Sequence, residues 1–294
     1  MKIGVILPMS VVDTPGGGMP SWPEARAFAQ GAEAAGLDSV WVFDHFYNDP
    51  VEGPIEGQHE GWSTLVATAA VTERVEVGSI VLCSTFRHPG LVAKMAATTD
   101  EVSGGRLILG LGAGWHDPEY DAFGFPKDHR VDRFEDTLRI VRPLLAGERV
   151  TVDGRYTSVR DAELVPAPSR RVPILVAAFG PRMLRLTATY ADAWNTAWYG
   201  APNDELREHF AAFDAALDEV GRDPADVQRT VGVRIAGPHG EPDDDDEAFI
   251  GSVDDVARIL DGYEALGADH LIVGLEPIVD SSLDHLAAAM ARRG

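Results

Sequence analysis

The sequence contains little cysteine, no long apolar run and few basic residues. Cys83 is the only cysteine among 294 residues, which excludes an internal disulfide and is typical of a reducing compartment. No apolar run reaches the roughly 18 residues of a membrane span, and the opening MKIGVILPMS lacks the pattern of a signal peptide. We therefore expect a cytoplasmic protein that does not bind membranes.

Basic residues are outnumbered, because 25 Lys and Arg stand against 47 Asp and Glu, for a formal net charge of −22. A nucleic-acid surface needs clustered Lys and Arg to displace counterions, so we expect no nucleic-acid partner. We interpret the acidic run Asp243–Glu247 as a solvated loop rather than a metal site. An anionic ligand is expected only where backbone N–H groups or arginines gather locally.

What the sequence does contain is a regular alternation of apolar runs and helical patterns. The apolar runs predict eight strands, at Ile3–Pro8, Ser39–His45, Val75–Leu82, Arg106–Gly114, Pro173–Gly180, Asp192–Trp198, Thr230–Gly237 and His270–Pro277. Eight consecutive strand–helix pairs without an interdomain linker indicate an α/β protein, a (β/α)8 TIM barrel in a single domain over residues 1–294. A doubly wound sheet is the alternative.

Long insertions follow four of the predicted strands. They span Met9–Trp22, Phe46–Ser63, Trp115–Asp132 and Pro238–Ser252, whereas the loops before the strands are short. All four therefore lie at the carboxyl ends of strands, which is the face where barrel enzymes build their active sites. We expect the functional residues on that face.

The stretch LGLGAGWHDPEY, Leu109–Tyr120, places three glycines at alternate positions in the fourth strand. A dinucleotide-binding G-x-G-x-x-G would need a glycine where Trp115 stands and would lie in the first βα turn, so this fingerprint is excluded. Two interpretations stay open. Either the strand end is packed tightly in the barrel, or it allows a flat ligand to approach the backbone closely.

Other strand ends carry polar residues that suit a ligand. Asp44 and His45 close the second strand, where a histidine can donate a hydrogen bond or move a proton, unless both are tied into loop hydrogen bonds. FGPRML, Phe179–Leu184, begins a helix with an arginine in its first turn and suits a phosphate group. We assign Arg87 and His88 to fixing their loop rather than to ligand binding.

Metal-dependent and serine-triad chemistry are not expected. The loops lack His-x-His near the first strand and a helical His-x-x-x-His, although they contain several histidines, among them His45, His59, His88 and His116. No G-x-S-x-G nucleophile motif is present either. Aromatic residues gather in the same segments and suit an apolar pocket for a planar ligand or substrate.

Together these segments resemble the luciferase-like monooxygenase superfamily, in particular its actinobacterial coenzyme F420-dependent oxidoreductases. The resemblance is carried by WVFDHF, STFRHPGLVAKMAATTDEVSGGRLILGLGAGWHDPEYDAFGFP, RFEDTLRIVRPLL, FGPRML and YADAWNT, in the order of the family. It implies a barrel enzyme, a homodimer, that transfers a hydride between the deazaflavin C5 of coenzyme F420 and a small organic substrate. The alternative is an FMN-dependent monooxygenase, which uses dioxygen and needs a flavin reductase as partner.

The resemblance also implies which residues contact the cofactor. Asp44 and His45 would lie near the ring, with His45 as the proton donor or a hydrogen-bond partner. Ser79, Ile80 and Val81 resemble the bulge of the family, which carries a non-prolyl cis peptide against the ring. The remaining contacts would be Gly112, Ala113 and Gly114 along the cofactor, and Ala177, Ala178, Phe179, Gly180, Pro181, Arg182 and Met183 around its phosphate.

Four residues are expected to shape the substrate pocket, namely Tyr47, Trp115, Trp198 and Glu276. The chain departs here from the sugar-phosphate dehydrogenases of this branch, which carry a Trp shortly after the Asp-His pair and a Glu directly after the glycines. This sequence instead has Tyr47-Asn48-Asp49 and Trp115 at those places. The departure argues against a sugar-phosphate substrate.

Overall fold

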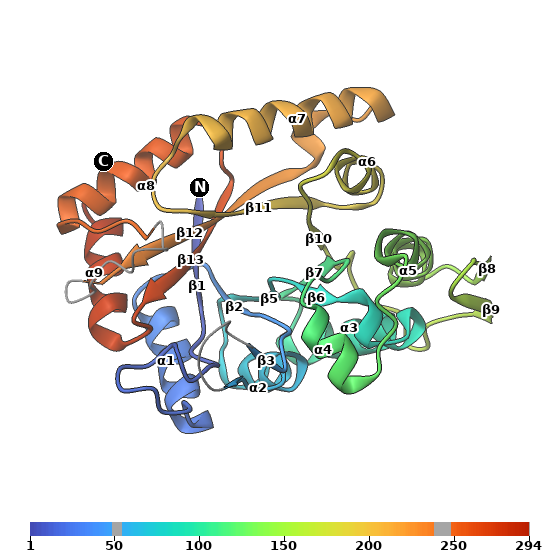
Figure 1. Ribbon diagram of the computed structural model, residues 1–294, viewed down its shortest axis with the longest axis horizontal. Helices are drawn as coiled ribbons and strands as arrows, with labels where there is room; N and C mark the ends of the chain where they lie inside the picture. Colours follow the sequence, from blue (N-terminus) through green and yellow to red (C-terminus); the bar gives the residue numbers. More distant parts are fainter. Residues whose placement is uncertain (49–54, 238–247, 294) are drawn as a thin grey trace.

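The computed structural model describes residues 1–48, 55–237 and 248–293, and its strands close into a parallel barrel (Figure 1). The eight barrel strands are β1 (Lys2–Ile6), β2 (Ser39–Val42), β5 (Glu76–Ser79), β7 (Leu107–Gly112), β10 (Ile174–Ala177), β11 (Ala193–Tyr199), β12 (Gln228–Ala236) and β13 (His270–Glu276). They pair in parallel in the order β10-β11-β12-β13-β1-β2-β5-β7, and the pairing of β7 with β10 closes the ring. The predicted (β/α)8 barrel is confirmed. The acidic run Asp243–Glu247 lies outside the described residues.

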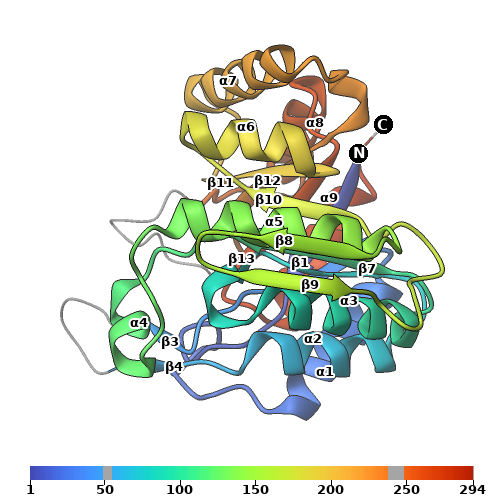
Figure 2. The ribbon, with the colours of Figure 1, turned by 90° about the vertical axis from the view of Figure 1, so that its right-hand side faces the viewer.

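A helix follows each barrel strand and packs on the outside of the ring (Figures 1 and 2). These helices are α1 (Trp22–Ala34), α2 (Gly61–Val71), α3 (Pro89–Ser103), α5 (Arg130–Leu145), α6 (Pro181–Tyr190), α7 (Asp204–Val220), α8 (Val253–Ala265) and α9 (Asp280–Met290). Helix α7 shows why. Asn203 caps its first turn, Gly221 ends it at φ +69°, and its buried face repeats with helical spacing at Leu206, Phe210, Phe213 and Leu217. Among the described residues no helix combines the length and apolar character needed to cross a membrane.

The expectation of plain loops after the second and fourth strands was wrong. The segment after β7 contains helix α4 (Asp117–Phe123), which starts with acidic residues and a proline and stops at Gly124, at φ +74°. These are ordinary start and stop signals that the short length of the helix conceals. The segment after β2 contains the two-residue strands β3 (Tyr47–Asn48) and β4 (Glu56–Gly57), which pair with each other beside α4 (Figure 2).

The third predicted strand is interrupted. After β5 the chain leaves the ladder at a cis peptide bond between Ile80 and Val81, and it pairs again with β7 as β6 (Leu82–Cys83). The non-prolyl cis bond stands where the family resemblance placed it. A short helix, η1 (Ser84–Phe86), follows and leads into α3. Outside the ring, β8 (Val150–Asp153) and β9 (Ser158–Ala162) form a hairpin beside α5 (Figures 1 and 2). A second short helix, η2 (Pro224–Asp226), precedes β12.

A buried histidine lies at the opposite, amino-terminal end of the barrel. Trp41 Nε1 donates to Ser39 Oγ at 2.7 Å, and Ser39 Oγ lies 2.7 Å from His270 Nε2. An indole N–H can only donate, so the serine accepts from Trp41, and its remaining lone pair and proton let it pair with His270 Nε2 in either tautomer of the neutral ring. Burial, together with the charges of Lys2 and the amino terminus, lowers the pKa of His270 to about 3.

This depressed pKa predicts a loss of stability in mild acid. In the unfolded chain a histidine takes up a proton below about pH 6.5, whereas folded His270 stays neutral until about pH 3. Between these values the unfolded state binds one more proton. This residue therefore lowers the unfolding free energy by about 1.4 kcal/mol for each unit by which the pH is decreased. Urea unfolding of the wild type and of His270→Gln across this range measures it. Equal pH slopes for the two proteins would contradict the assignment.

Candidate functional site

His45, directly beyond β2, is held by a carboxylate from α4. Its Nδ1 lies 2.9 Å from Glu119 Oε2, and the other oxygen of Glu119 accepts the N–H of Phe46 at 2.5 Å. Burial alone would raise the pKa of Glu119, but the hydrogen bonds from His45 and Phe46 outweigh it and hold that pKa below its usual value. An ionised carboxylate accepts only, so Nδ1 carries the proton and Nε2 is left as an acceptor. Among the described residues no hydrogen bond reaches Nε2.

Aromatic side chains surround the His45 ring. Trp115 meets it edge-on with ring centroids 5.4 Å apart, and His116 does so at 6.0 Å. Tyr47 lies 6.2 Å from His116, and its hydroxyl donates to the carbonyl of Pro118 at 3.0 Å. Three of the predicted site residues, His45, Tyr47 and Trp115, are therefore brought together. His116 and Glu119 complete this group, although no spacing or motif in the sequence pairs them with His45.

Asp44 has a structural role, because both oxygens of its carboxylate accept hydrogen bonds from other residues of the protein. Arg87 donates to both oxygens at 2.6 and 2.8 Å, and the N–H of Cys83 donates to Oδ2 at 2.9 Å. Arg87 also contacts Glu60, the N-cap residue of α2. Burial disfavours a charged guanidinium, but these two carboxylates outweigh it and hold the pKa of Arg87 above its usual value. The contacts agree with a structural role for Arg87.

The alternating glycines of β7 are explained by close packing. A Cβ on Gly110 would lie 1.7 Å from Ser79 O, one on Gly112 would lie 2.6 Å from Val81, and one on Gly114 would strike the Tyr120 hydroxyl. Ser79 Oγ also exchanges hydrogen bonds with the backbone of Gly110. Of the two interpretations left open, tight packing of the strand end accounts for the missing side chains. The glycines seat the bulge that contains the cis peptide.

The start of α6 offers backbone donors. Its N-cap is Gly180, no side chain caps it, and nothing lies within 4 Å of a Cβ built there. The first N–H groups of a helix have no partner within it, so they are available to an anion. The Arg182 side chain turns away to ion pairs with Asp132 and Glu135. The segment predicted to contact the phosphate, Ala177–Met183, thus includes a helix start whose backbone N–H groups no side chain caps.

The remaining two predicted pocket residues form a second group, at the ends of β11 and β13. Trp198 follows a cis peptide bond with Ala197, and the Arg234 guanidinium lies 6.0 Å from the centroid of its ring. Arg234 in turn lies 3.8 Å from Glu276. The arrangement pairs a cation with both an aromatic face and a carboxylate.

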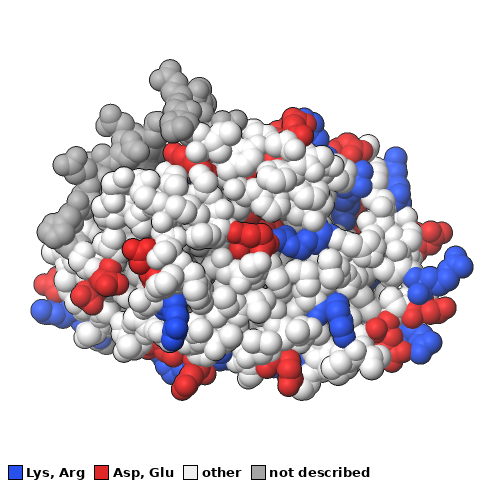
Figure 3. Space-filling view, turned by 90° about the horizontal axis from the view of Figure 1, so that it is seen from below, with Lys and Arg blue, Asp and Glu red and all other residues white. Residues whose placement is uncertain are grey.

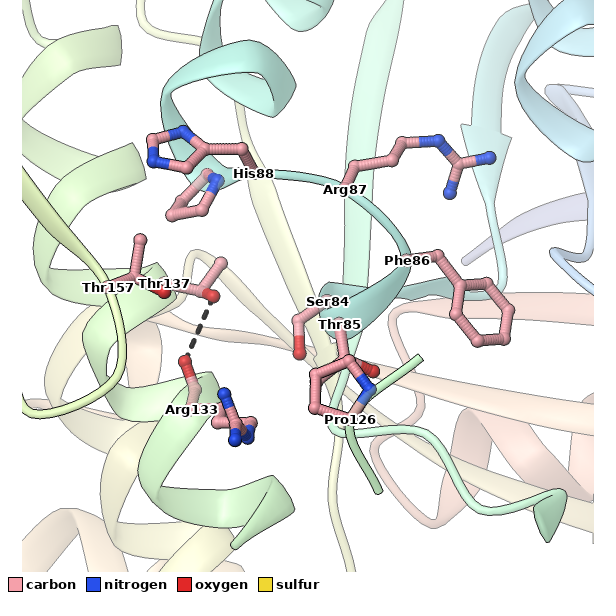
Figure 4. Close-up of a pocket in the computed structure, with 10 residues that line it drawn as sticks. Ser84, Thr85, Phe86, Arg87, His88, Pro126, Arg133, Thr137 and Thr157 are labelled. Carbon is pink, nitrogen blue, oxygen red and sulfur yellow. Dashed lines mark hydrogen bonds between the residues drawn. The ribbon is translucent and has the colours of Figure 1, made fainter. Parts of the chain in front are cut away.

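A separate cavity of about 170 Å³ lies between η1, the start of α3 and α5. In Figure 4 the side chain of Arg87 extends away from Ser84, Thr137 and Arg133, while Thr137 donates to the carbonyl of Arg133 at 3.0 Å. His88, at the rim, caps α3 by accepting the N–H of Gly90. Arg87 and His88 therefore hold this loop in place, which is the role that the sequence indicated.

The fold and these contacts define a barrel protein whose candidate ligand site lies at the carboxyl ends of its strands. The chain belongs to the luciferase-like monooxygenase family, whose family model matches residues 1–248. Among solved structures, an F420-dependent secondary alcohol dehydrogenase, in complex with an F420-acetone adduct, superposes with a TM-score of 0.78. It is 20% identical and the match covers 98% of each chain, so this similarity supports the fold alone.

Curated relatives are similar in sequence over part of their length. An F420-dependent glucose-6-phosphate dehydrogenase of Microbacterium testaceum is 35% identical over 70% of this chain and 61% of the relative. An F420-dependent hydroxymycolic acid dehydrogenase of Mycobacterium tuberculosis is 34% identical over 67% of this chain and 54% of the relative. The chain thus matches less than two thirds of the length of these relatives.

Proposed function

We propose that this protein is a coenzyme F420-dependent oxidoreductase that acts on a small organic substrate at the carboxyl face of the barrel. The observation that carries the proposal is the His45–Glu119 pair beside the exposed Trp115. Glu119 and Trp115 follow β7, which pairs with β10, the strand that leads to the open start of α6. Hydride chemistry on an alcohol or carbonyl carbon also moves a proton at the oxygen, and a histidine with a free Nε2 is suited to move it. The F420-dependent relatives support the same cofactor.

The described residues fit this cofactor. An uncapped helix with an open Gly180 suits the phosphate, and the bulge at Ile80 and Val81 stands where the family resemblance places the ring. We assign the contacts to the cofactor as the family resemblance implies, with three exceptions. The Asp44 carboxylate acts by fixing the bulge through Arg87 and Cys83. The absence of side chains at Gly112 and Gly114 serves packing, and the Arg182 side chain is held by Asp132 and Glu135. When bound, the deazaflavin accepts or supplies the hydride. No metal is part of the proposal.

The residues of this chain would orient the substrate and handle the proton. Glu119 fixes the ring of His45 and keeps the proton on Nδ1, so that Nε2 can take the hydroxyl proton when an alcohol is oxidised. In the reverse direction, His45 protonated at both nitrogens returns that proton to the carbonyl oxygen. Tyr47 and Trp115 wall the substrate on this side, and Trp198 and Glu276 belong to the second group at the face. The homodimer and the cytoplasmic location remain predictions.

A charge placed at the α6 start tests the cofactor assignment. Gly180→Asp should weaken F420 binding at least about tenfold, because an N-cap aspartate occupies the N–H groups and repels phosphate. Aspartate is a favoured N-cap residue, so the melting temperature should stay equal or rise. Fluorescence titration measures the dissociation constants for F420 and for FMN.

Val279→Asp is the matched control, because Val279 is the uncapped N-cap residue of α9 at the same end of the barrel. It adds the same charge outside the proposed cradle and should leave F420 affinity unchanged. Micromolar binding of F420 without binding of FMN supports the proposal. Binding of FMN alone would overturn it in favour of the flavin monooxygenase.

A further inference from the structure

We propose that the substrate is an uncharged alcohol or carbonyl compound with an apolar body, and that His45 and His116 hold its oxygen. The inference rests on the proposed function and names the substrate class of the same site. It separates this chain from the sugar-phosphate activity that the names of several relatives state. Three features carry it, namely the charge of the face, its aromatic wall and an unpartnered histidine nitrogen.

The first feature is the charge of the eight segments that follow the barrel strands. By sequence they contain sixteen Asp and Glu, one, five, four and six of them after β1, β2, β7 and β12. Only two of the 25 basic residues of the chain, Arg87 and Lys127, lie in these segments. Arg87 is paired with Asp44 and Glu60, and Lys127 with Asp121. Eight of the sixteen acidic residues lie in the part of the chain that the structure describes, namely Asp13, Asp44, Glu56, Glu60, Asp117, Glu119, Asp121 and Asp128. The acidic balance of these segments by sequence, together with the pairing of both cations, disfavours a phosphorylated substrate.

Basic residues at the starts of the neighbouring helices are paired as well. At the starts of α5 and α6, Arg130 pairs with Asp117, Arg133 with Asp128, and Arg182 with Asp132 and Glu135. Figure 3, seen from below the view of Figure 1, shows Lys and Arg side chains interspersed with Asp and Glu over that side of the molecule. Arg234, near the end of β12, is a further cation of the site, and it lies 3.8 Å from the Glu276 carboxylate. The backbone N–H groups at the start of α6 are also donors for an anion, and the proposed function assigns them to the cofactor.

The second feature is an aromatic wall beside His45. Trp115 is 66% exposed although its ring meets that of His45, and Phe123 on α4 is 54% exposed. Phe46 stacks on Phe86 at 4.8 Å and contacts Phe123 at 4.6 Å, so Phe123 is part of a phenylalanine cluster. Large aromatic surfaces left exposed next to polar groups are typical of ligand sites. This wall suits an alkyl, alicyclic or aromatic substrate body.

The third feature is His116, which lies next to Trp115 in the chain and is 8% exposed. Its Nε2 is buried and has no hydrogen-bond partner among the described residues. Buried polar atoms are nearly always paired, so this nitrogen lacks a partner that a ligand can supply. His116 meets the rings of both His45 and Tyr47. Because the rings of His45 and His116 have centroids 6.0 Å apart, we infer that a substrate oxygen bound by His45 lies close to His116 as well.

The proposed reaction balances with the cofactor as the redox partner. In the oxidising direction the hydroxyl proton passes to His45 Nε2, the carbinol hydrogen leaves as hydride to the deazaflavin, and the C–O bond becomes a carbonyl. The reverse sequence reduces a ketone. His116 donates to or accepts from the same oxygen without a change in its own protonation.

Substrate preference tests the proposal on the F420-loaded protein. The probes are secondary alcohols with alkyl, cyclohexyl and phenyl bodies, their ketones, and glucose 6-phosphate. We expect at least one neutral pair to be turned over with a kcat/KM at least about 100-fold above that of glucose 6-phosphate. A higher kcat/KM for the sugar phosphate, or no turnover and no saturation-transfer NMR signal for every neutral probe, overturns the proposal. Failure of F420 itself to bind is a separate result, which overturns the proposed function.

Two variants of His116 test the second histidine. His116→Leu should raise KM for the neutral substrate about 3- to 10-fold, the effect of one lost neutral hydrogen bond, with a smaller change in kcat and in F420 affinity. His116→Gln keeps a polar group near the Nε2 position and should restore most of the loss. Melting temperatures report on folding. An unchanged KM in His116→Leu would show that water, and not substrate, is the partner of this nitrogen, and would remove His116 from the proposal.

Discussion

Replacing His45 with alanine should lower kcat by about 10²- to 10⁴-fold, while the dissociation constant for F420 changes less than about threefold. The reason is the geometry of the ring, whose Nδ1 is held by Glu119 and whose Nε2 is left to exchange a proton with the substrate oxygen. Positioned general acids and bases contribute rate factors of this size, whereas cofactor binding uses many other contacts. The measurement is steady-state reduction of F420 with the best neutral alcohol, alongside a fluorescence titration of the cofactor.

Two further variants show whether the ring acts as described. Glu119→Gln keeps the size of the side chain but removes its charge and gives Phe46 N–H a poorer partner, so kcat should fall less than in His45→Ala and its pH profile should shift. Nitrogen NMR of labelled histidine should show one tautomer of His45 in the wild type and a mixture in this variant. His88→Asn, which still caps α3, should leave kcat unchanged. Full activity in His45→Ala would remove His45 from the mechanism.

The barrel could be predicted because parallel strands buried on both faces appear as continuous apolar runs. β13 illustrates this, since His270–Glu276 has a run of buried residues within the predicted His270–Pro277. The face of the candidate site was chosen from the same pattern, because the long insertions come after strands. The position of the cis bond came from the resemblance and not from any residue preference, since neither Ile80 nor Val81 signals it locally.

The pairing within the site could not be predicted, because closure of the barrel creates it. Glu119 and His45 are 74 residues apart and reach each other from segments after β7 and β2, which β5 separates in the sheet. The packing partners of Gly110 could not be predicted for the same reason. Alternate glycines show that something approaches the strand, but only the folded chain shows that Ser79 and Val81 are the nearest atoms. The seven-residue helix α4 was missed because it is too short to show a helical repeat.

Replacing Asp44 with asparagine should lower the unfolding free energy by about 3 kcal/mol, because it leaves the buried Arg87 guanidinium short of a charged partner. Side-chain exposure is 1% for Asp44 and 12% for Arg87, so water cannot replace the lost carboxylate. Urea unfolding measures the change. Asp121→Asn, which breaks the exposed pair with Lys127, is the matched control and should change stability by less than about 1 kcal/mol.

The same variant should also disturb the site. Asp44 joins the end of β2 to β6 through Cys83 N–H and to α2 through Arg87 and Glu60, so its loss loosens the segment that presents His45. The double variant Asp44→Asn with Arg87→Met removes both charges and should lose less stability than the sum of the two single changes, since neither charge is left alone. If the single and double changes add, the ion pair is not what holds this segment. His45 would then be positioned by Glu119 alone, and Asp44→Asn would leave kcat close to that of the wild type.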